Sequence, residues 1–377
     1  MGAVKVVALG DAHLGRSYLS PTEGGVNVRE LDFERSFEAA VETALAEEPD
    51  VLVWLGDIFD HPRPTFRSFR LVQRALAGIA ELGVPTVVIT GNHDTPRLPG
   101  TESPYATLAD TFGHRIHFAF RMRYERIELP GLVVHAVPQM HSVEDTMDAL
   151  DHAADQRSLD RSNLLLAHPL VRVPAVQPRY ADINEIEVDD AMLRSDLTLL
   201  GHYHVHTEIR SGVWYAGSTD TFTFADEPGR AKGVLVLDTD SGACRHVALG
   251  GQRPLVTLPT VAAQGLSPAE VSALVMERAA SVPAGAVARL FVDGVDPEAY
   301  RLLDLAAVQD AAAAALHLKL QPDFVDAAGP VDDLADLASM PARWEGYVGD
   351  QDLTGFDHQR ISRLGREYLV RAVEDSG

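Results

Sequence analysis

Short apolar runs alternate with amphipathic stretches over roughly the first 200 residues. The runs are continuous rather than alternating, which is typical of strands buried on both faces. Between them, apolar residues recur with the spacing of one helical face at about 31–48, 66–82 and 143–154. Buried strands separated by helices predict an α/β fold. The predicted strands are KVVAL, DVLVWL, PTVVIT, LVVHAV and NLLLA.

The pattern changes after residue 200. Two stretches, HTEIRSGVWYAGS and KGVLVLDTDSGACRHVAL, have strand-like segments on both sides of glycine-containing turns. This arrangement predicts β-hairpins. We expect these strands to extend a second sheet.

The pattern changes again after residue 250, where strands and helices predict a small βαβαβ domain. Its helices would begin at Ser267-Pro268 and Asp296-Pro297, which are favourable pairs of capping residue and first helical residue. An acidic segment follows, and the last stretch places five apolar residues on one helical face. The predicted organisation is a domain at 1–250, a small domain at 251–325, and a linker with a C-terminal helix at 326–377. The apolar face consists of Phe356, Ile361, Leu364, Tyr368 and Leu369.

Composition describes an acidic chain of 377 residues with a net charge of −23, which argues against a large basic face. The single cysteine, Cys244, cannot form an internal disulfide and fits a reducing compartment. The first apolar run is broken early by Asp11, so we expect neither a signal peptide nor a membrane span. A cytoplasmic protein without membrane association is therefore predicted.

Polar side chains that can bind metal follow five strand-like runs, including the run LTLL. In open α/β sheets, sites form beyond the carboxyl ends of strands, so these side chains should converge. Oxygen and imidazole donors without thiolate suit Mn, Fe or Zn. The donors are too many for one ion, and a bridging carboxylate would let two ions lie ~3.5–4 Å apart. The residues are Asp11 and His13, then Asp57, then Asn92, His93 and Asp94, then His168, and finally His202 and His204.

Each motif by itself has a simpler interpretation. An isolated GDAH or GHYH is more often a capped turn or a surface histidine, whereas five such motifs in order favour a metal site. Glycines precede the ligands and permit tight turns (Gly10, Gly56, Gly91 and Gly201). His206 begins the next strand and is interpreted as structural or as an outer neighbour of the site. His61 follows Asp57 by four residues and could approach the site.

The motifs GDAH, GDIFDH, GNHD, AHP and GHYH resemble those of the calcineurin-like metallophosphoesterases over about the first 220 residues. Within that superfamily, DAHLGRSY, GDIFDHPRPTFRSF and WYAGSTDTFTFADE are most similar to the SbcD-type nucleases of DNA double-strand-break repair. The resemblance implies a two-sheet sandwich flanked by helices, with a small α+β capping domain and a C-terminal helical segment.

The resemblance also implies residue roles. One metal would be held by Asp11, His13, Asp57 and His204, and the other by Asp57, Asn92, His168 and His202. The catalytic residues would be His93, which faces the scissile phosphate, and the bridging Asp57. Some relatives have a histidine three residues after the bridging aspartate, where this chain has Asp60 followed by His61. This departure leaves the role of His61 and the balance of exonuclease and endonuclease activity open, with Asp60, His61, Asp94 and His206 as outer neighbours.

The implied function is a metal-dependent DNA exo- and endonuclease, an SbcD-like subunit of a repair complex. Its cofactors would be two divalent ions, for which family usage favours Mn²⁺ and leaves Fe and Zn open. Its partners would be DNA, an SbcC-like SMC-type coiled-coil ATPase and a second copy of the chain. Arg67 and Arg70 could contact the DNA phosphates or be ordinary surface arginines.

Two other functions remain open. The acidic charge favours a small-molecule or phosphoprotein phosphoesterase on the same fold. The second domain and the terminal helix argue against a compact phosphatase. A non-catalytic binding subunit is disfavoured by the complete ligand set.

Overall fold

The computed structural model describes residues 3–19, 21–98, 101–173, 186–224 and 229–325, together with the helical positions 344, 348, 360, 362–366 and 368. Three residues of the predicted C-terminal apolar face, Phe356, Ile361 and Leu369, lie outside the described residues. Among the helices that are described, none has the length and apolar character needed to cross a membrane.

The chain divides into two compact units, each built from three segments that alternate along the sequence. The first comprises Met1–Val261, Ser272–Phe291 and Asp304–Gln321, and the second comprises Ala262–Val271, Val292–Leu303 and Pro322–Gly377. The domain boundaries predicted at residues 250 and 325 stay a prediction.

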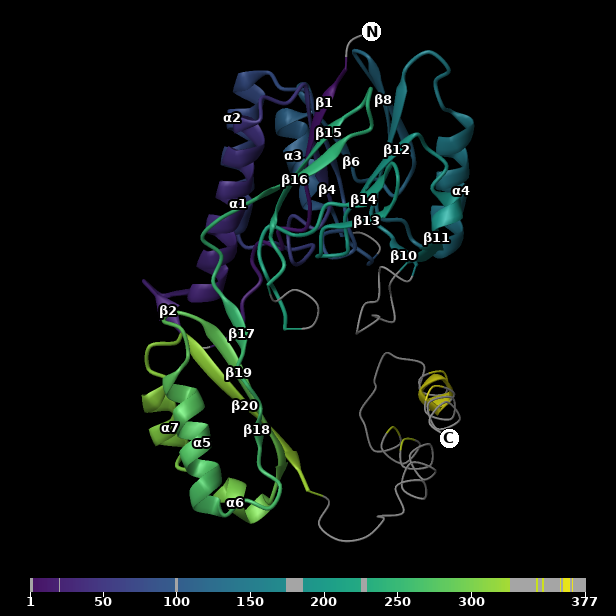
Figure 1. Cartoon of the computed structure of the whole chain (residues 1–377). Coiled ribbons are helices and arrows are strands. Elements are labelled where there is room, and N and C mark those ends of the chain that lie inside the picture. The colour runs from purple at the N-terminus through teal and green to yellow at the C-terminus, as the bar shows by residue number, and fades with distance from the viewer. Residues whose placement is uncertain are drawn as a thin grey trace. The chain divides into compact units, whose positions relative to one another are not determined.

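Two six-stranded sheets form most of the first unit (Figure 1). The first has the strand order β16-β15-β1-β4-β5-β6 and the second has the order β13-β14-β12-β9-β8-β7. The first sheet consists of β1 (Lys5–Leu9), β4 (Val51–Leu55), β5 (Thr86–Ile89), β6 (Ile116–Ala119), β15 (Gly233–Asp238) and β16 (Cys244–Ala248). The second consists of β7 (Glu125–Leu129), β8 (Leu132–Val137), β9 (Ser162–Ala167), β12 (Leu197–Leu200), β13 (Thr207–Arg210) and β14 (Val213–Tyr215).

Side-chain alternation along the strands builds a sandwich of two sheets with helices on both outer faces. In β1, Val6 and Ala8 pack in the core between the sheets, while Val7 and Leu9 pack in the core beneath the helices. Both faces of such strands are buried, which explains their continuous apolar sequence. The helices of the first outer layer are α1 (Val28–Ala46), α2 (Phe66–Leu82) and α3 (Pro104–Phe112), and that of the other is α4 (Val143–Asp155) (Figure 1).

The strands and helices predicted before residue 250 are present, with one correction, although α3 and β6 were not predicted. Helix α2 has the expected bounds, because Thr65 caps its first turn and Gly83 ends it in the left-handed conformation. The expectation that both hairpins extend the second sheet is wrong. The β13–β14 hairpin joins that sheet, whereas β15 pairs with β1 and places the β15–β16 hairpin in the first sheet. A turn between two strand-like segments predicts that the segments pair with each other, but not which other strand the hairpin pairs with.

The remaining elements include the predicted small sheet after residue 250. Its strands β17, β19 and β18 lie in that order, and β20 pairs with β19. Asp296 caps α6, as expected, by accepting hydrogen bonds from the backbone of Glu298 and Ala299. These elements are β17 (Leu255–Thr257), β18 (Val261–Ala262), α5 (Pro268–Ala280), β19 (Val287–Val295), α6 (Pro297–Arg301), α7 (Leu305–Ala311) and β20 (His317–Phe324). Short connecting elements are β2 (Thr22–Glu23), β3 (Val26–Asn27), β10 (Leu170–Arg172), β11 (Glu187–Asp189) and the 3₁₀ turn η1 (Asp190–Met192).

Candidate metal centre

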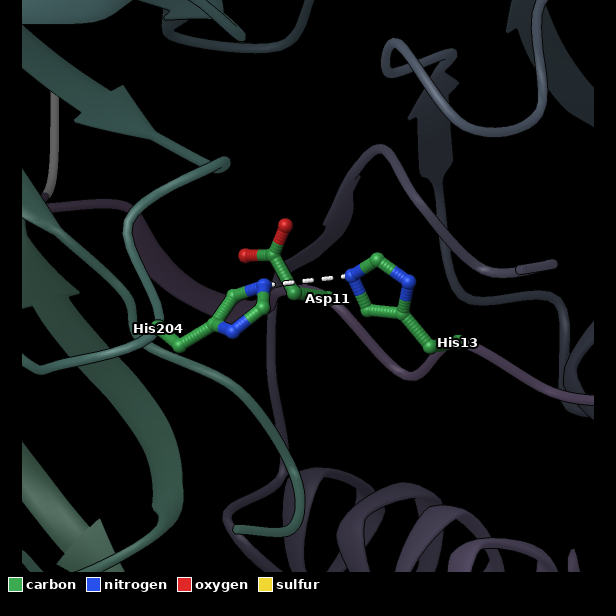
Figure 2. Close-up of side chains that lie close together, drawn as sticks. All are labelled: Asp11, His13 and His204. Carbon is green, nitrogen blue, oxygen red and sulfur yellow. Dashed lines mark hydrogen bonds between the residues drawn. The ribbon is translucent and has the colours of Figure 1, made fainter. Parts of the chain in front are cut away.

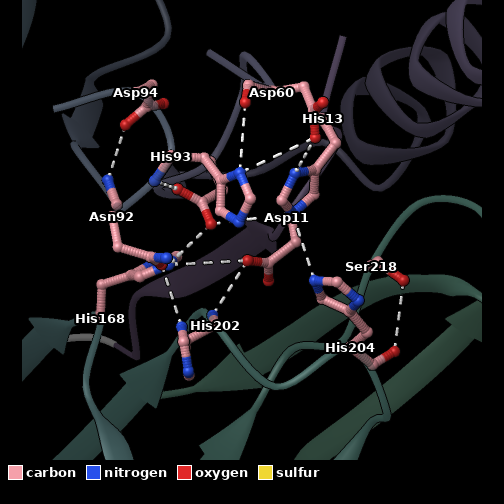
Figure 3. Close-up of polar contacts among 12 residues, drawn as sticks. Asp11, His13, Asp60, Asn92, His93, Asp94, His168, His202, His204 and Ser218 are labelled. Carbon is pink, nitrogen blue, oxygen red and sulfur yellow. Dashed lines mark hydrogen bonds and ion pairs between the residues drawn. The ribbon is translucent and has the colours of Figure 1, made fainter. Parts of the chain in front are cut away.

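The polar residues that follow five strands of the two sheets converge on one site (Figure 3). Strands β1, β4 and β5 are parallel neighbours in the first sheet, and β9 and β12 are parallel neighbours in the second. Their carboxyl ends therefore lie at one edge of each sheet, and the sandwich brings the two edges together. The convergence expected from the sequence is confirmed.

Asp11, His13 and His204 form one side of this site (Figure 2). The Nε2 atoms of His13 and His204 lie 3.1 Å apart, and potential ligand atoms of all three residues lie within 4.8 Å of one another. His13 Nδ1 donates to Asp60 Oδ1 at 2.9 Å. This hydrogen bond orients the ring and leaves Nε2 available to a cation.

Asp57 lies between the two sides of the site and is buried. Its Oδ2 is 3.2 Å from His168 Nε2 and 3.7 Å from His13 Nε2, and its Oδ1 accepts from the backbone N–H of His93 at 2.8 Å. His168 Nδ1 donates to Leu55 O at 2.5 Å, so its Nε2 points toward the carboxylates. Asp57 thus lies within reach of candidate ligands on both sides of the site.

His202 and Asn92 complete the other side. The Nδ1 of His202 is 3.0 Å from Asn92 Oδ1, and the backbone N–H of His202 donates to Asp11 Oδ1 at 2.9 Å. Asp11 thereby touches both sides of the site. All seven residues predicted as metal ligands are brought together.

His93 lies at the outer edge of the site, with 39% of its side chain exposed. Its Nδ1 donates to Asp60 O at 3.2 Å, and its ring meets that of His13 edge-on at 4.6 Å. A cavity of about 410 Å³ opens beside it, lined among others by His61, Arg63 and Arg97. Asn92 and His93 also line this cavity, so it adjoins the cluster of candidate ligands.

Burial and mutual charge determine the protonation of the cluster. Burial is the main influence on His13 and His202, and lowers their pKa to about 4 and about 3, so both imidazoles are neutral at pH 7. Burial likewise lowers the pKa of His168, but the Asp57 and Asp11 carboxylates outweigh it and raise that pKa to about 9. For Asp57, burial opposes ionisation, yet His168 and His13 hold its pKa well below the usual range. At pH 7 the side chains by themselves therefore combine two neutral imidazoles, a protonated His168 and an ionised Asp57, and a bound cation would take the place of the His168 proton.

The backbone at the ligands is strained. Asp11, His13, Asp57 and His202 have positive φ angles of 28°, 46°, 49° and 88°. Residues other than glycine rarely adopt this conformation, and where they do the strain often serves a site. Gly91 is also required, because a Cβ there would lie 2.6 Å from His168 Cε1 and still closer to Asp57 Oδ1.

The residues fit a pair of divalent cations. Asp11 Oδ2 and His168 Nε2 are buried atoms without a hydrogen-bond partner. The 3.2 Å separation of His168 Nε2 from Asp57 Oδ2 is an ion-pair contact rather than a well-directed hydrogen bond. Unsatisfied buried polar atoms are costly, and atoms of this kind aimed into a cluster of carboxylates and imidazoles suit a cation.

Asp94 and His61, which were predicted as outer neighbours of the site, lie in two different places. Asp94 is buried and accepts from the backbone N–H of Ile58 and Gly91, so it joins the loops that carry Asp57 and Asn92. Burial raises the pKa of Asp94 to about 7. His61 lies in the wall of the cavity, and its Nδ1 accepts from Arg63 N.

The remaining predicted residues lie away from the ligands. His206 bonds Tyr215 O through Nδ1 and stacks on His246 at 4.7 Å. Arg67 donates twice to the Glu34 carboxylate, at 2.6 and 2.5 Å, and shares a surface hollow with Arg70. The structure therefore places Arg67 in an ion pair with its own chain.

Three neighbours of the site escaped the sequence analysis. Phe222 packs edge-on against both His13 and His204, with ring centroids 4.9 Å away. The buried Lys232 Nζ donates to His204 O, and Arg16 pairs with Asp60 at 3.2 Å. The run GSTDTF contains Phe222, but nothing in its local pattern distinguishes it from a core phenylalanine.

We predict that Gly91→Ala weakens cation binding, because its Cβ would displace Asp57 and His168. The measurement is the rise in melting temperature on adding Mn²⁺, which reports ligand binding to the folded state. Gly78→Ala, in the middle of α2 with nothing within 4 Å of the added Cβ, is the matched control and should retain the full rise. A full rise in Gly91→Ala would contradict the role of this close approach.

Comparison with known proteins agrees with this geometry. The family model for calcineurin-like phosphoesterase matches residues 4–229. Relatives named DNA double-strand break repair protein Mre11 are 27% identical over 258 residues in Thermoplasma acidophilum, 25% over 236 in Methanocaldococcus jannaschii and 25% over 243 in Saccharolobus solfataricus. The alignments cover 65%, 60% and 62% of this chain and 65%, 61% and 60% of the relatives, so less than two thirds of each relative is matched. The family match extends over most of the first unit and includes every residue of the metal cluster, and this chain therefore belongs to the calcineurin-like phosphoesterase family.

Proposed function

We propose that this chain is a DNA nuclease that hydrolyses phosphodiester bonds with two divalent metal ions. The observation that carries the proposal is the shared carboxylate of Asp57, which lies between two sets of ligands and behind the exposed His93. One set is Asp11, His13 and His204, and the other is Asn92, His168 and His202. Mn²⁺ is the proposed ion, because oxygen and imidazole ligands without thiolate suit it.

The chemistry divides between the ions and the chain. When bound, two such ions withdraw charge from the phosphodiester and make a water nucleophilic near neutral pH. His93 contributes a ring that faces the cavity, held by the carbonyl of Asp60. From there it would stabilise charge on the phosphate or protonate the leaving oxygen. Asp60 also orients His13, so one residue supports a metal ligand and the catalytic histidine.

DNA is the proposed substrate because the relatives are named for DNA double-strand break repair. We further propose an SbcC-like SMC-type ATPase as partner, docked through the helix within 326–377, and a homodimer of this chain. Support for these assemblies is the resemblance of the motifs and the apolar C-terminal pattern. The proposed domains are the nuclease at 1–250 and the capping domain at 251–325.

A phosphoesterase for small molecules or phosphoproteins is the second candidate. The net charge of −23 favours it, because DNA enzymes commonly carry a basic stripe. The cavity beside His93 is also large enough for a small phosphate ester. The two proposed functions use the same metal centre and differ only in the substrate that binds there.

Substrate turnover separates these candidates. With Mn²⁺, the chain should cleave single-stranded DNA far faster than p-nitrophenyl phosphate or cyclic nucleotides. His93→Leu should bind the same metal but lose cleavage by roughly 10²-fold or more, the scale of a lost proton-transfer group. Preference for the small esters would favour the second candidate, and loss of metal from His93→Leu would make His93 a ligand.

Asp57→Ala tests the bridge. Each ion would lose a ligand, and the two positive charges would lose the anion between them. Metal analysis should find that the variant retains neither ion in stoichiometric amount, whereas the wild-type chain retains two. Two tightly bound ions in the variant would contradict the bridging role.

Arg67 and Arg70 are proposed to contact the DNA backbone. Each phosphate contact contributes a slope of about −0.7 to the dependence of binding on salt for single strands. The isolated chain should show only about three or four such contacts. Replacing both arginines by alanine should reduce this slope. Because Arg67 is already paired with Glu34, Arg70→Ala alone should account for most of the change.

The control for that measurement is Arg172→Ala, which removes another exposed arginine paired with a glutamate. An equal slope in the wild-type chain and in the Arg67/Arg70 variant would make both arginines ordinary surface residues.

A further inference from the structure

A buried arginine lies beneath one side of the metal centre. Arg29, on α1, has no exposed surface, and its guanidinium has partners in three segments of the chain. Its Nε donates to Tyr18 Oη at 3.0 Å, its Nη1 to Asp32 Oδ2 at 2.7 Å, and its Nη2 to Thr221 O at 2.8 Å. A buried charge is costly unless it is compensated in this way, so its partners are held firmly.

A second charged partner of Arg29 is Asp220, which is also fully buried. Its Oδ1 lies 3.4 Å from Arg29 Nη2 and accepts from Thr221 N at 2.6 Å, while its Oδ2 accepts from Ser36 Oγ at 2.6 Å. The Asp220 carboxylate thus fastens its own segment to two residues of α1. This segment, residues 218–222, follows Arg29 by nearly 200 residues in the sequence.

Segment 218–222 contacts the residues on the Asp11–His13–His204 side of the centre. Ser218 donates through its backbone N–H and its hydroxyl to His204 O, each at 3.2 Å, and Thr219 N donates to Asp11 O at 3.4 Å (Figure 3). The Phe222 ring packs edge-on against the imidazoles of His13 and His204. Both the backbone and the rings of these ligands therefore rest on segment 218–222.

The other side of the centre is held differently. His168 is oriented by the carbonyl of Leu55, at the end of β4, and His202 Nδ1 bonds Asn92. Apart from Asp11 and Asp57, which contact both sides, the ligands of the two sides therefore have separate supports.

We propose that the Arg29–Asp220 ion pair and Phe222 position His13 and His204, and thereby set the affinity of one metal position independently of the other. The inference rests on the proposed two-ion function. Asp60 fixes the His13 ring by a hydrogen bond, and Phe222 packs against one side of the His204 ring. Shortening the Phe222 side chain would remove this packing contact and loosen the position of the His204 ring. Supports of this kind behind a ligand typically change metal affinity by about 10–100-fold.

The test is a titration of the full-length, metal-free chain with Mn²⁺, followed by calorimetry and by electron paramagnetic resonance. Phe222→Leu and Asp220→Asn are the test variants. Phe37→Leu is the matched control, because Phe37 is an equally buried phenylalanine on α1 that packs on Trp54 instead of on ligands. Phe222→Leu keeps an apolar side chain and so tests the inference even if Asp220→Asn does not fold.

We expect one binding event to weaken roughly ten-fold or more in both test variants, while the other stays within about two-fold. The spectrum of two coupled ions should then give way to that of a single Mn²⁺ at intermediate concentrations. The Phe37→Leu control should bind both ions as the wild-type chain does, although it loses a comparable amount of core packing. A purely structural role would lower the stability of all three variants without separating the two events.

Two outcomes would overturn the inference alone: a folded Phe222→Leu chain that binds both ions normally, or one in which both ions weaken together. A wild-type chain that binds fewer than two ions would instead overturn the proposed two-ion function, and this inference with it.

Discussion

A carboxylate buried where the two sheets meet is the constraint on which the rest of the site depends. Asp57 is almost entirely removed from water, and an isolated charge in such a place costs several kcal/mol. His13 and His168 and the backbone N–H of His93 compensate it, and they come from three different strand ends in both sheets. The carboxylate is therefore stable only when the sandwich is closed, and a cation would complete its compensation.

The need for close approach explains the local sequence around that carboxylate. Gly91 must lack a side chain because Asp57 and His168 occupy the space, and Asp57 itself adopts a positive φ. Such backbone is unfavourable by itself, so the surrounding hydrogen bonds must hold it. Asp94 supplies two of them, to Ile58 N and Gly91 N, and receives the hydroxyl of Tyr105 at 2.5 Å. These hydrogen bonds come from the chain itself, so we expect them to lower the cost of ordering the loops when an ion binds.

The charges of the chain limit how it can meet a polyanion. With a net charge of −23, the chain as a whole repels DNA, and screening confines the attraction of local positive charges to about 10 Å at 0.1 M salt. Arg67 is paired with Glu34, so its charge is partly compensated. Arg63 and Arg97 line the cavity beside His93 and lie closer to the proposed chemistry. Local contacts of this kind, or a basic partner, would have to hold the substrate.

Much of the fold, and the convergence of the polar residues that follow the strands, could be predicted from the sequence, because both depend on local order. A buried strand appears in the sequence as a continuous apolar run. The residue that follows it lies at the carboxyl end of the strand, whichever neighbours the strand pairs with. Helix α2 has the expected bounds because Thr65 and Gly83 define its ends within the local sequence. The tertiary structure alone decided which sheet receives the β15–β16 hairpin, and it also decided that Arg67 meets Glu34. It likewise brought Arg29 to Asp220, 191 positions away, and set Phe222 behind two histidines. Periodicity indicates that a face is buried but not what covers it, since the covering residues are chosen by packing between distant segments.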